Sequence, residues 1–135
     1  MEPFNVDIFY SKVNDDIKYR SKNEYNQTIE MIFYKTEYMN DVWWSICLQV
    51  STKRNEFKYL EQPGKGGLYN LAWAKYVLIE FINTELDKKK NNTIIVQWDN
   101  SKRKRVYERY LKDLGFKYTI YDKLPSLVLK INKSN

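Results

Sequence analysis

The stretch QPGKGG at residues 62–67 leads directly into an apolar helix pattern that runs from Leu68 to Leu86. It contains three of the chain's four glycines. Glycine adopts backbone conformations that other residues avoid, and it lets a ligand approach the main chain closely. The first turn of a helix presents unpaired N–H groups and the positive end of the helix dipole. The stretch therefore predicts either a phosphate-binding cradle at a helix start or simply a tight loop.

Length and composition predict a single folded domain that spans residues 1–135. The chain is 43% hydrophobic and 30% charged, which argues against disorder. A net charge of +6 favours anionic partners such as nucleic acid, nucleotide phosphates or acidic surfaces. With one cysteine, Cys47, and no histidine, an internal disulfide, a Ser–His–Asp triad and a histidine-based zinc site are all excluded. Cys47 lies in the apolar run Trp43–Val50 and is expected to be a buried structural thiol.

The ends and apolar runs of the chain carry no membrane signal. The N-terminus begins with acidic and polar residues and does not resemble a signal peptide. No apolar run approaches the length that a membrane span requires. We therefore expect a soluble cytoplasmic protein without a membrane partner.

The first half of the chain reads mainly as strands, because β-branched and aromatic residues are frequent or alternate with polar ones. The residues between 17 and 25 are polar and mixed, and they give no clear assignment. A charged turn is expected over Thr52–Glu56. The predicted strands are Asn5–Val13, Gln27–Thr36, Val42–Ser51 and Glu56–Leu60.

The second half alternates helices and strands. The run Lys88–Lys90 is expected to close the first helix against its negative end, and Asn91-Asn92 to form the exit turn. Residues 99–101 read as the start of a second helix, which reaches about Leu114 and ends at Gly115. The remaining predicted strands are Thr93–Trp98, Phe116–Tyr121 and Leu127–Ile131. This order predicts an α+β fold: a single central mixed, mostly antiparallel sheet flanked by two main helices.

From Glu56 onward the chain resembles the GCN5-related N-acetyltransferase superfamily. The first matching segment is the glycine stretch with the apolar helix behind it, which is similar to that family's pyrophosphate loop. The second is the strand and asparagine of Ile94–Asn100, followed by Tyr107 seven residues after the asparagine and then by Gly115-Phe116. The resemblance implies an acyl-CoA N-acyltransferase-like sheet that is splayed between its middle strands, where the cofactor lies.

The same resemblance implies acetyl transfer from acetyl-CoA to an amine and assigns roles to individual residues. Asn100 would either hydrogen-bond the pantetheine arm or cap the second helix, and Tyr107 would either protonate the departing thiolate or pack as a helix aromatic. The backbone amides that would hold the pyrophosphate are those of Gly64, Lys65, Gly66 and Gly67.

The sequence also departs from the family pattern. Glu61 stands where the pyrophosphate loop usually begins with glutamine or arginine. The helix pair that usually follows the first strand, and helps to form the acceptor site, is not evident. The carboxylates that remain as candidate bases are Glu37, Glu56 and Glu61.

Two other functions fit the same residues. One is a non-catalytic binding protein that holds nucleic acid or a protein partner through aromatic side chains and a basic stripe on the second helix. The other, suggested by small size and biased composition, is a host-interaction protein of a mobile element. The basic stripe consists of Lys102, Arg105, Arg109 and Lys112.

Overall fold

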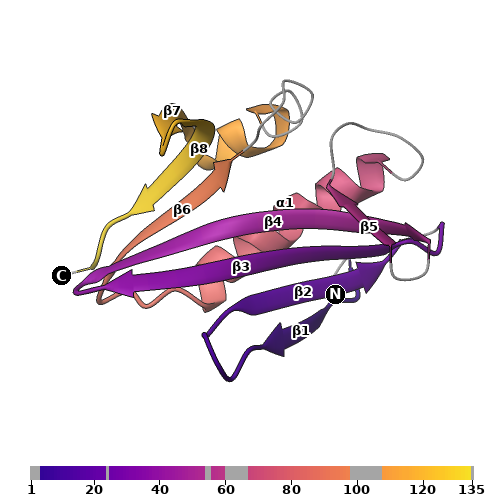
Figure 1. Cartoon of the computed structure of the whole chain (residues 1–135), viewed down its shortest axis with the longest axis horizontal. Coiled ribbons are helices and arrows are strands. Elements are labelled where there is room, and N and C mark those ends of the chain that lie inside the picture. Colours follow the sequence, from indigo (N-terminus) through magenta and orange to yellow (C-terminus); the bar gives the residue numbers. More distant parts are fainter. Residues whose placement is uncertain (1–3, 24, 54–55, 60–66, 98–107, 135) are drawn as a thin grey trace.

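The computed structural model describes residues 4–23, 25–53, 56–59, 67–97 and 108–134. These form an eight-stranded sheet with one long helix, α1 (Gly67–Thr84), packed along one face (Figure 1). The strands are β1 (Asp7–Tyr10), β2 (Ile17–Lys22), β3 (Thr28–Tyr38), β4 (Asp41–Lys53), β5 (Glu56–Tyr59), β6 (Asn91–Gln97), β7 (Lys117–Tyr121) and β8 (Leu124–Ile131).

The strand order is β1-β2-β3-β4-β6-β8-β7, with β5 paired to β4 outside this path. The first five strands form an antiparallel meander, and β6, β7 and β8 also pair antiparallel. Only β4 and β6 pair parallel among the described strands, because α1 carries the chain back between β5 and β6. The sheet is therefore mixed and mostly antiparallel.

The predicted α+β class with two main flanking helices is wrong, because the described chain is predominantly β. The second predicted helix is described only from Glu108, and it ends in the 3₁₀ turn η1 (Lys112–Leu114). Its Leu111 joins the same core cluster as the apolar face of α1, so both helical segments cover one face of the sheet. More of the described residues lie in strands than in these two helical segments. Strands β3 and β4 are 11 and 13 residues long, and residues 17–22, which the sequence left unassigned, form β2.

Several predicted boundaries move for identifiable reasons. Helix α1 ends at Thr84, so the run Lys88–Lys90 lies in the turn beyond it and does not close the helix. Asn91 and Asn92 belong to β6 instead of an exit turn. Asp122 and Lys123 adopt positive φ angles of 50° and 66° and make a two-residue hairpin turn, which places Pro125 inside β8 opposite Ile120.

Other predictions at this level are confirmed. Gly115 ends the second helical segment in the left-handed conformation, with φ of 97°, and its N–H donates to the Lys112 carbonyl. The strand predicted just before the glycine stretch is present as β5. The expected burial of Cys47 is met only in part, because the residue is half-buried and its Sγ donates to Gln49 Oε1 at 3.9 Å.

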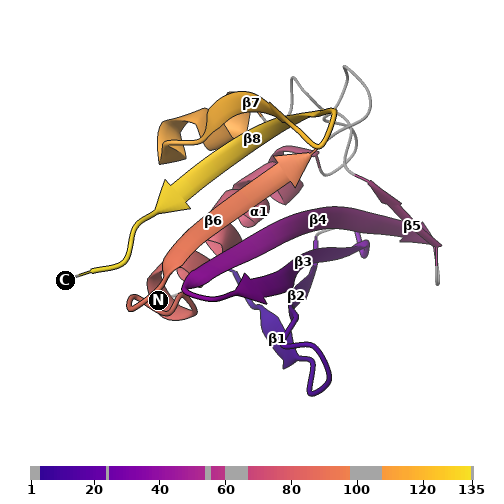
Figure 2. The same ribbon diagram turned by 60° about the vertical axis from the view of Figure 1, so that its left-hand side comes forward.

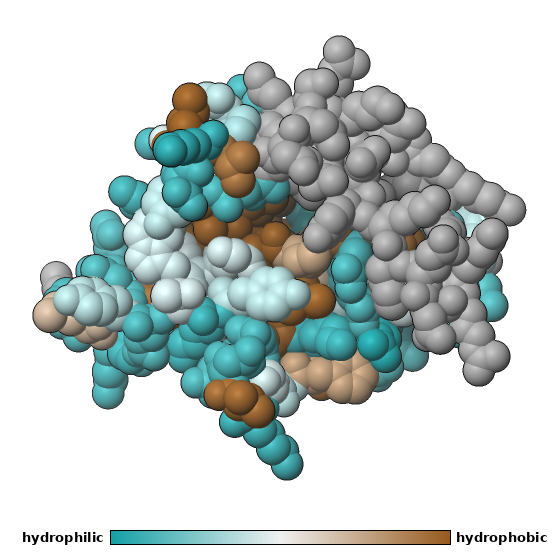
Figure 3. All heavy atoms as spheres, in the orientation of Figure 1, coloured by the Kyte–Doolittle hydropathy of each residue, from teal (hydrophilic) through white to brown (hydrophobic). Residues whose placement is uncertain are grey.

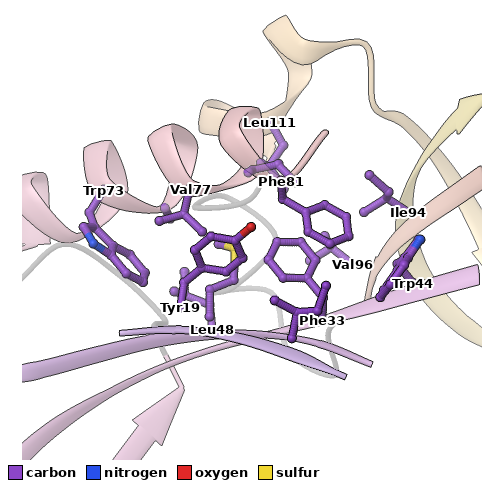
Figure 4. Close-up of a cluster of buried hydrophobic side chains, with 14 of the residues drawn as sticks. Tyr19, Phe33, Trp44, Leu48, Trp73, Val77, Phe81, Ile94, Val96 and Leu111 are labelled. Carbon is purple, nitrogen blue, oxygen red and sulfur yellow. The ribbon is translucent and has the colours of Figure 1, made fainter. Parts of the chain in front are cut away.

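The core lies between the sheet and α1 and is centred on stacked aromatic rings (Figure 4). Phe33 of β3 and Phe81 of α1 stack with ring centroids 3.7 Å apart and an interplanar angle of 7°. Trp44 meets Phe81 edge-on at 4.9 Å, and Tyr19 meets Phe33 edge-on at 5.7 Å. Offset and edge-on aromatic pairs contribute about 0.5–1.5 kcal/mol beyond the burial of their area. This cluster fixes the C-terminal part of α1 against β2, β3 and β4.

Buried hydrogen bonds position the N-terminal part of α1 above the β2–β3 end of the sheet. The indole Nε1 of Trp73 donates to Ser21 Oγ at 2.8 Å, and that hydroxyl donates to the Asn5 carbonyl at 2.7 Å. Asn23 Nδ2 donates to Asn70 Oδ1 at 2.9 Å. Because the side chains of Ser21, Asn23, Asn70 and Trp73 are buried, the bonds also satisfy polar atoms that would otherwise destabilise the fold.

Candidate functional site

The two middle strands of the sheet separate after a short paired stretch. The parallel register of β4 and β6 runs from Asp41↔Asn91 to Ser45↔Ile95. Beyond that point β6 continues with β8, while β4 continues toward β5, whose register begins at Gln49. Figures 1 and 2 show the resulting V between β4 and β6. We call the space beyond Ser45 and Ile95 the strand opening.

The closed end of this V is held together by asparagine side chains. Asn92 Oδ1 accepts from Trp44 Nε1 at 3.3 Å, so the side chain joins β6 to β4. Asn92 Nδ2 donates to the carbonyls of Asp87 and Lys90, which ties the preceding turn to the same point. Asn91 Nδ2 donates to Asp41 Oδ1 at 3.1 Å. These bonds hold the two strands together at one end only, so their twist carries them apart at the other.

An apolar hollow lies beneath the strand opening. Its empty volume is about 430 Å³, including the mouth. Figure 3 shows hydrophobic side chains in a recess in the middle of the face seen in Figure 1. Helix α1 lines the hollow with residues spaced three and four apart, as expected for one helix face. The lining residues are Met31, Ile46, Leu48, Leu71, Ala74, Lys75, Leu78, Val96, Tyr110 and Leu111.

Among the described residues of this lining, Lys75 is the single charged one, and it is ion-paired. Its Nζ lies 3.2 Å from Asp113 Oδ2, which joins α1 to η1. Lys75 is about one-third exposed and Asp113 is 70% exposed, so we expect the pair to contribute no more than about 1 kcal/mol. The hollow therefore presents hydrocarbon on most sides, which suits a narrow, flexible and largely uncharged ligand segment.

Most residues predicted to form the site lie outside the described residues. They are Gly64, Lys65, Gly66, Asn100 and Tyr107, together with Glu61, Lys102 and Arg105 of the wider predictions. Gly67 is described, and it is the first residue of α1, so the glycine stretch does lead directly into the helix start. Its position leaves the first N–H groups of α1 without intrahelical acceptors.

The other described candidates do not converge on the strand opening. Glu37 pairs with Lys35 and Lys90 and is not among the residues that line the hollow. Glu56 is in β5. Arg109 is exposed, with its guanidinium 5.7 Å from the Tyr110 ring, and Lys112 is exposed at the start of η1. The nucleic-acid alternative based on the basic stripe stays a prediction.

Sequence reasoning missed the lining of the hollow, although part of its signal was present. Leu71, Ala74 and Leu78 lie on one face at helical spacing, but the whole helix is so apolar that no one face stands out. Sequence reasoning also missed Asn92, which it assigned to a turn. Asn92 joins β6 to β4 by a hydrogen bond to Trp44, 48 residues away, and no local sequence pattern predicts that contact.

The described residues contain no group of three or more acidic or cysteine side chains arranged to hold a metal ion. Neither described helix is long and apolar enough to cross a membrane. Comparison with protein-family models gave no match, and comparisons with curated proteins and with solved structures gave no significant match.

Proposed function

We propose that the chain is an acetyl-CoA-dependent N-acetyltransferase-like protein that transfers an acetyl group to an amine. The observation that carries this proposal is the strand opening above an apolar hollow. The pantetheine arm of coenzyme A is a thin chain in which amides alternate with short alkyl segments. Such an arm suits the space between diverging strands, because strand edges offer backbone partners to its amides and the hollow accepts its alkyl parts.

The glycine stretch supports the same proposal from the sequence. In this proposal the backbone amides of Gly64, Lys65, Gly66 and Gly67 hold the pyrophosphate. Gly67 begins α1, so the helix dipole and its unpaired N–H groups favour an anionic group there. The net charge of +6 favours a polyanionic cofactor in the same way.

Acetyl-CoA supplies a thioester that an amine can attack. In the proposed reaction the amine nitrogen bonds to the thioester carbon, the carbon–sulfur bond breaks, and a carboxylate takes the proton that the nitrogen releases. Tyr107 donates a proton to the departing sulfur. Asn100 orients the pantetheine arm. The chain's contribution is mainly to hold the reacting groups together.

Calorimetry with coenzyme A tests the proposed site through Ala74, a buried residue of α1 that lines the hollow. Ala74→Leu places a larger side chain where the pantetheine arm would lie, so we expect at least about tenfold weaker binding, equivalent to about 1.4 kcal/mol. Ala72→Leu is the matched control, because Ala72 is exposed on the same helix. Absence of binding by the folded wild-type chain at millimolar coenzyme A would refute the proposal.

Two further variants separate binding from chemistry. Gly66→Asp puts a negative charge beside the pyrophosphate, and we expect it to weaken coenzyme A binding. Tyr107→Phe keeps the ring but removes the proton donor, so thiol release from acetyl-CoA in the presence of an amine mixture should slow about 10²-fold or more at unchanged affinity. Binding without thiol release in the wild type would leave cofactor binding standing and refute catalysis.

A further inference from the structure

A second hollow lies on the other flank of α1, between that helix and strands β1 and β2. Its empty volume is about 600 Å³, including the mouth. It is more polar than the hollow beneath the strand opening, because carboxylates and hydroxyls take part in its lining. The lining residues are Val6, Ile8, Tyr19, Tyr76, Val77, Glu80, Thr84 and Glu85.

The hydroxyl of Tyr19 is buried in this lining without a hydrogen-bond partner among the described residues. Tyr19 is only 2% exposed, and Figure 4 shows its oxygen pointing from β2 toward α1. Thr84 is close enough to influence the pKa of Tyr19, but its hydroxyl donates to the Glu80 carbonyl at 2.7 Å and forms no hydrogen bond with Tyr19. Buried tyrosine hydroxyls usually have a partner, so this one points to a group that completes it.

Two carboxylates border the same space. Glu85 Oε1 accepts a hydrogen bond of 2.6 Å from the Tyr10 hydroxyl, and its other oxygen bonds to none of the described residues. Burial is the main cause that raises the pKa of Tyr19, followed by the negative charge of Glu85, with a smaller contribution from Glu80. The Tyr19 hydroxyl is therefore neutral at physiological pH, and its oxygen can accept a hydrogen bond from a cation. None of the described residues that line the hollow is a lysine or arginine.

We propose that this hollow, which we call the amine pocket, binds a small primary ammonium ion that carries a short alkyl chain. The ammonium group would donate to the carboxylates of Glu80 and Glu85 and to the hydroxyl oxygen of Tyr19. The alkyl chain would contact Val6, Ile8 and Val77 on the apolar side of the lining.

The amine pocket is separate from the strand opening and does not depend on the proposed acetyl transfer. The lining of the strand opening takes Leu71, Ala74, Lys75 and Leu78 from α1. The amine pocket takes Tyr76, Val77, Glu80 and Thr84 from the helix and Glu85 just beyond its end. The body of the helix and its core side chains separate the two. A ligand in the amine pocket would thus occupy a second site, not the acceptor position beside the proposed cofactor.

Titration of the full chain with n-butylammonium, followed by amide NMR, tests the amine pocket. We expect saturable shifts of the Val77 and Thr84 amide signals, with binding at least about tenfold tighter than that of 1-butanol or butyrate. 1-Butanol has the same butyl chain and butyrate a chain one carbon shorter, and both lack the positive charge. Equal binding of 1-butanol, or no saturable shift at 50 mM n-butylammonium, would overturn the proposal.

Substitutions test which groups hold the ammonium ion. Glu80→Gln removes a negative charge at nearly constant shape, and we expect about tenfold weaker n-butylammonium binding. Tyr19→Phe removes only the hydroxyl, and we expect about three- to tenfold weakening. Glu108→Gln and Tyr38→Phe are the matched controls away from the pocket. Affinities of both pocket variants within twofold of the wild type, in chains whose amide spectra show the native fold, would overturn the assignment.

Discussion

The two flanks of α1 differ in chemistry although the helix is apolar on nearly every side. The flank beneath the strand opening faces Ile46, Leu48 and Val96, so its hollow is lined by hydrocarbon. The flank toward β1 and β2 contains the buried Tyr19 hydroxyl of the sheet together with Glu80, Thr84 and Glu85 at the C-terminal end of the helix, so its hollow is more polar. The comparison teaches that residues of the helix and of the sheet together decide what each hollow can bind.

The largest expected effect comes from Phe81→Ala, which removes the ring that α1 contributes to the central aromatic stack. Phe81 is fully buried against Phe33 and Trp44, between the two flanks. We expect the free energy of unfolding to fall by about 3–5 kcal/mol, and both hollows to lose their shape. Urea denaturation measures the change. Ile79→Ala, at a 37% exposed position of the same helix, should cost much less, and equal losses would contradict this account of the core.

A smaller effect, confined to one flank, is expected from Asn92→Ala. The change leaves Trp44 Nε1 and the carbonyls of Asp87 and Lys90 without their side-chain partner at the closed end of β4 and β6. Each unsatisfied buried group costs about 1–3 kcal/mol, less where water reaches it, so we expect a loss of roughly 2 kcal/mol.

Hydrogen exchange measures which strands lose stability in Asn92→Ala. Amides of β6 should exchange faster, because this strand loses its tie to β4, while amides of β2 should keep their protection. Uniform acceleration across the sheet would contradict a local role for Asn92. Asn91→Ala serves as the control, because Asn91 is less buried and its side chain bonds only to Asp41 Oδ1 and the Lys133 N–H among the described residues.

Alkaline pH is expected to lower the stability of the protein through Tyr19, which lies on only one flank of α1. Its folded-state pKa is raised above the ordinary value of 10, mainly by burial, so the folded chain holds this proton more tightly than the unfolded chain. Titration of this group therefore leaves stability unaffected below pH 10 and lowers it above pH 10, by at most about 1.4 kcal/mol per pH unit.

Tyr19→Phe is the variant that isolates this pH dependence. It should remove most of the loss between pH 10 and 11.5 when unfolding by urea is compared with that of the wild type. The pKa of Tyr10 is also raised, first by its hydrogen bond to Glu85, so a weaker dependence should remain. An unchanged pH profile in Tyr19→Phe would contradict the buried state of this hydroxyl.

The smallest expected effect is that of Tyr19→Phe at neutral pH without added amine. Removing a buried hydroxyl that lacks a protein partner should raise the free energy of unfolding by about 1 kcal/mol. Tyr38→Phe, at a 70% exposed position, should change it by less than about 0.5 kcal/mol. A marked destabilisation in Tyr19→Phe would mean that the hydroxyl already has a partner in the folded chain.

Local pattern predicted those elements whose own residues set their conformation. The apolar helix after the glycine stretch, the strands that became β3 and β4, and the glycine end of the second helical segment all follow from propensity and periodicity. β2 was missed because Ile17 and Tyr19 are its only apolar residues, so their alternation with Lys18 and Arg20 is too short to stand out from the polar residues around it. The second helix was predicted to be a main flanking helix from its cap signal and its basic stripe, and neither of these features measures helix length.

For the candidate site, too, some features could be predicted from the sequence and others could not. The amino-acid sequence by itself determined that a glycine stretch feeds the start of an apolar helix, since both features depend on neighbouring residues. Only the tertiary structure decided that β4 and β6 part after Ser45 and Ile95 and that Tyr19 lines the same hollow as Glu80 and Glu85. Both depend on registers between strands and helices far apart in the chain, and such contacts leave no periodic signal in either segment alone.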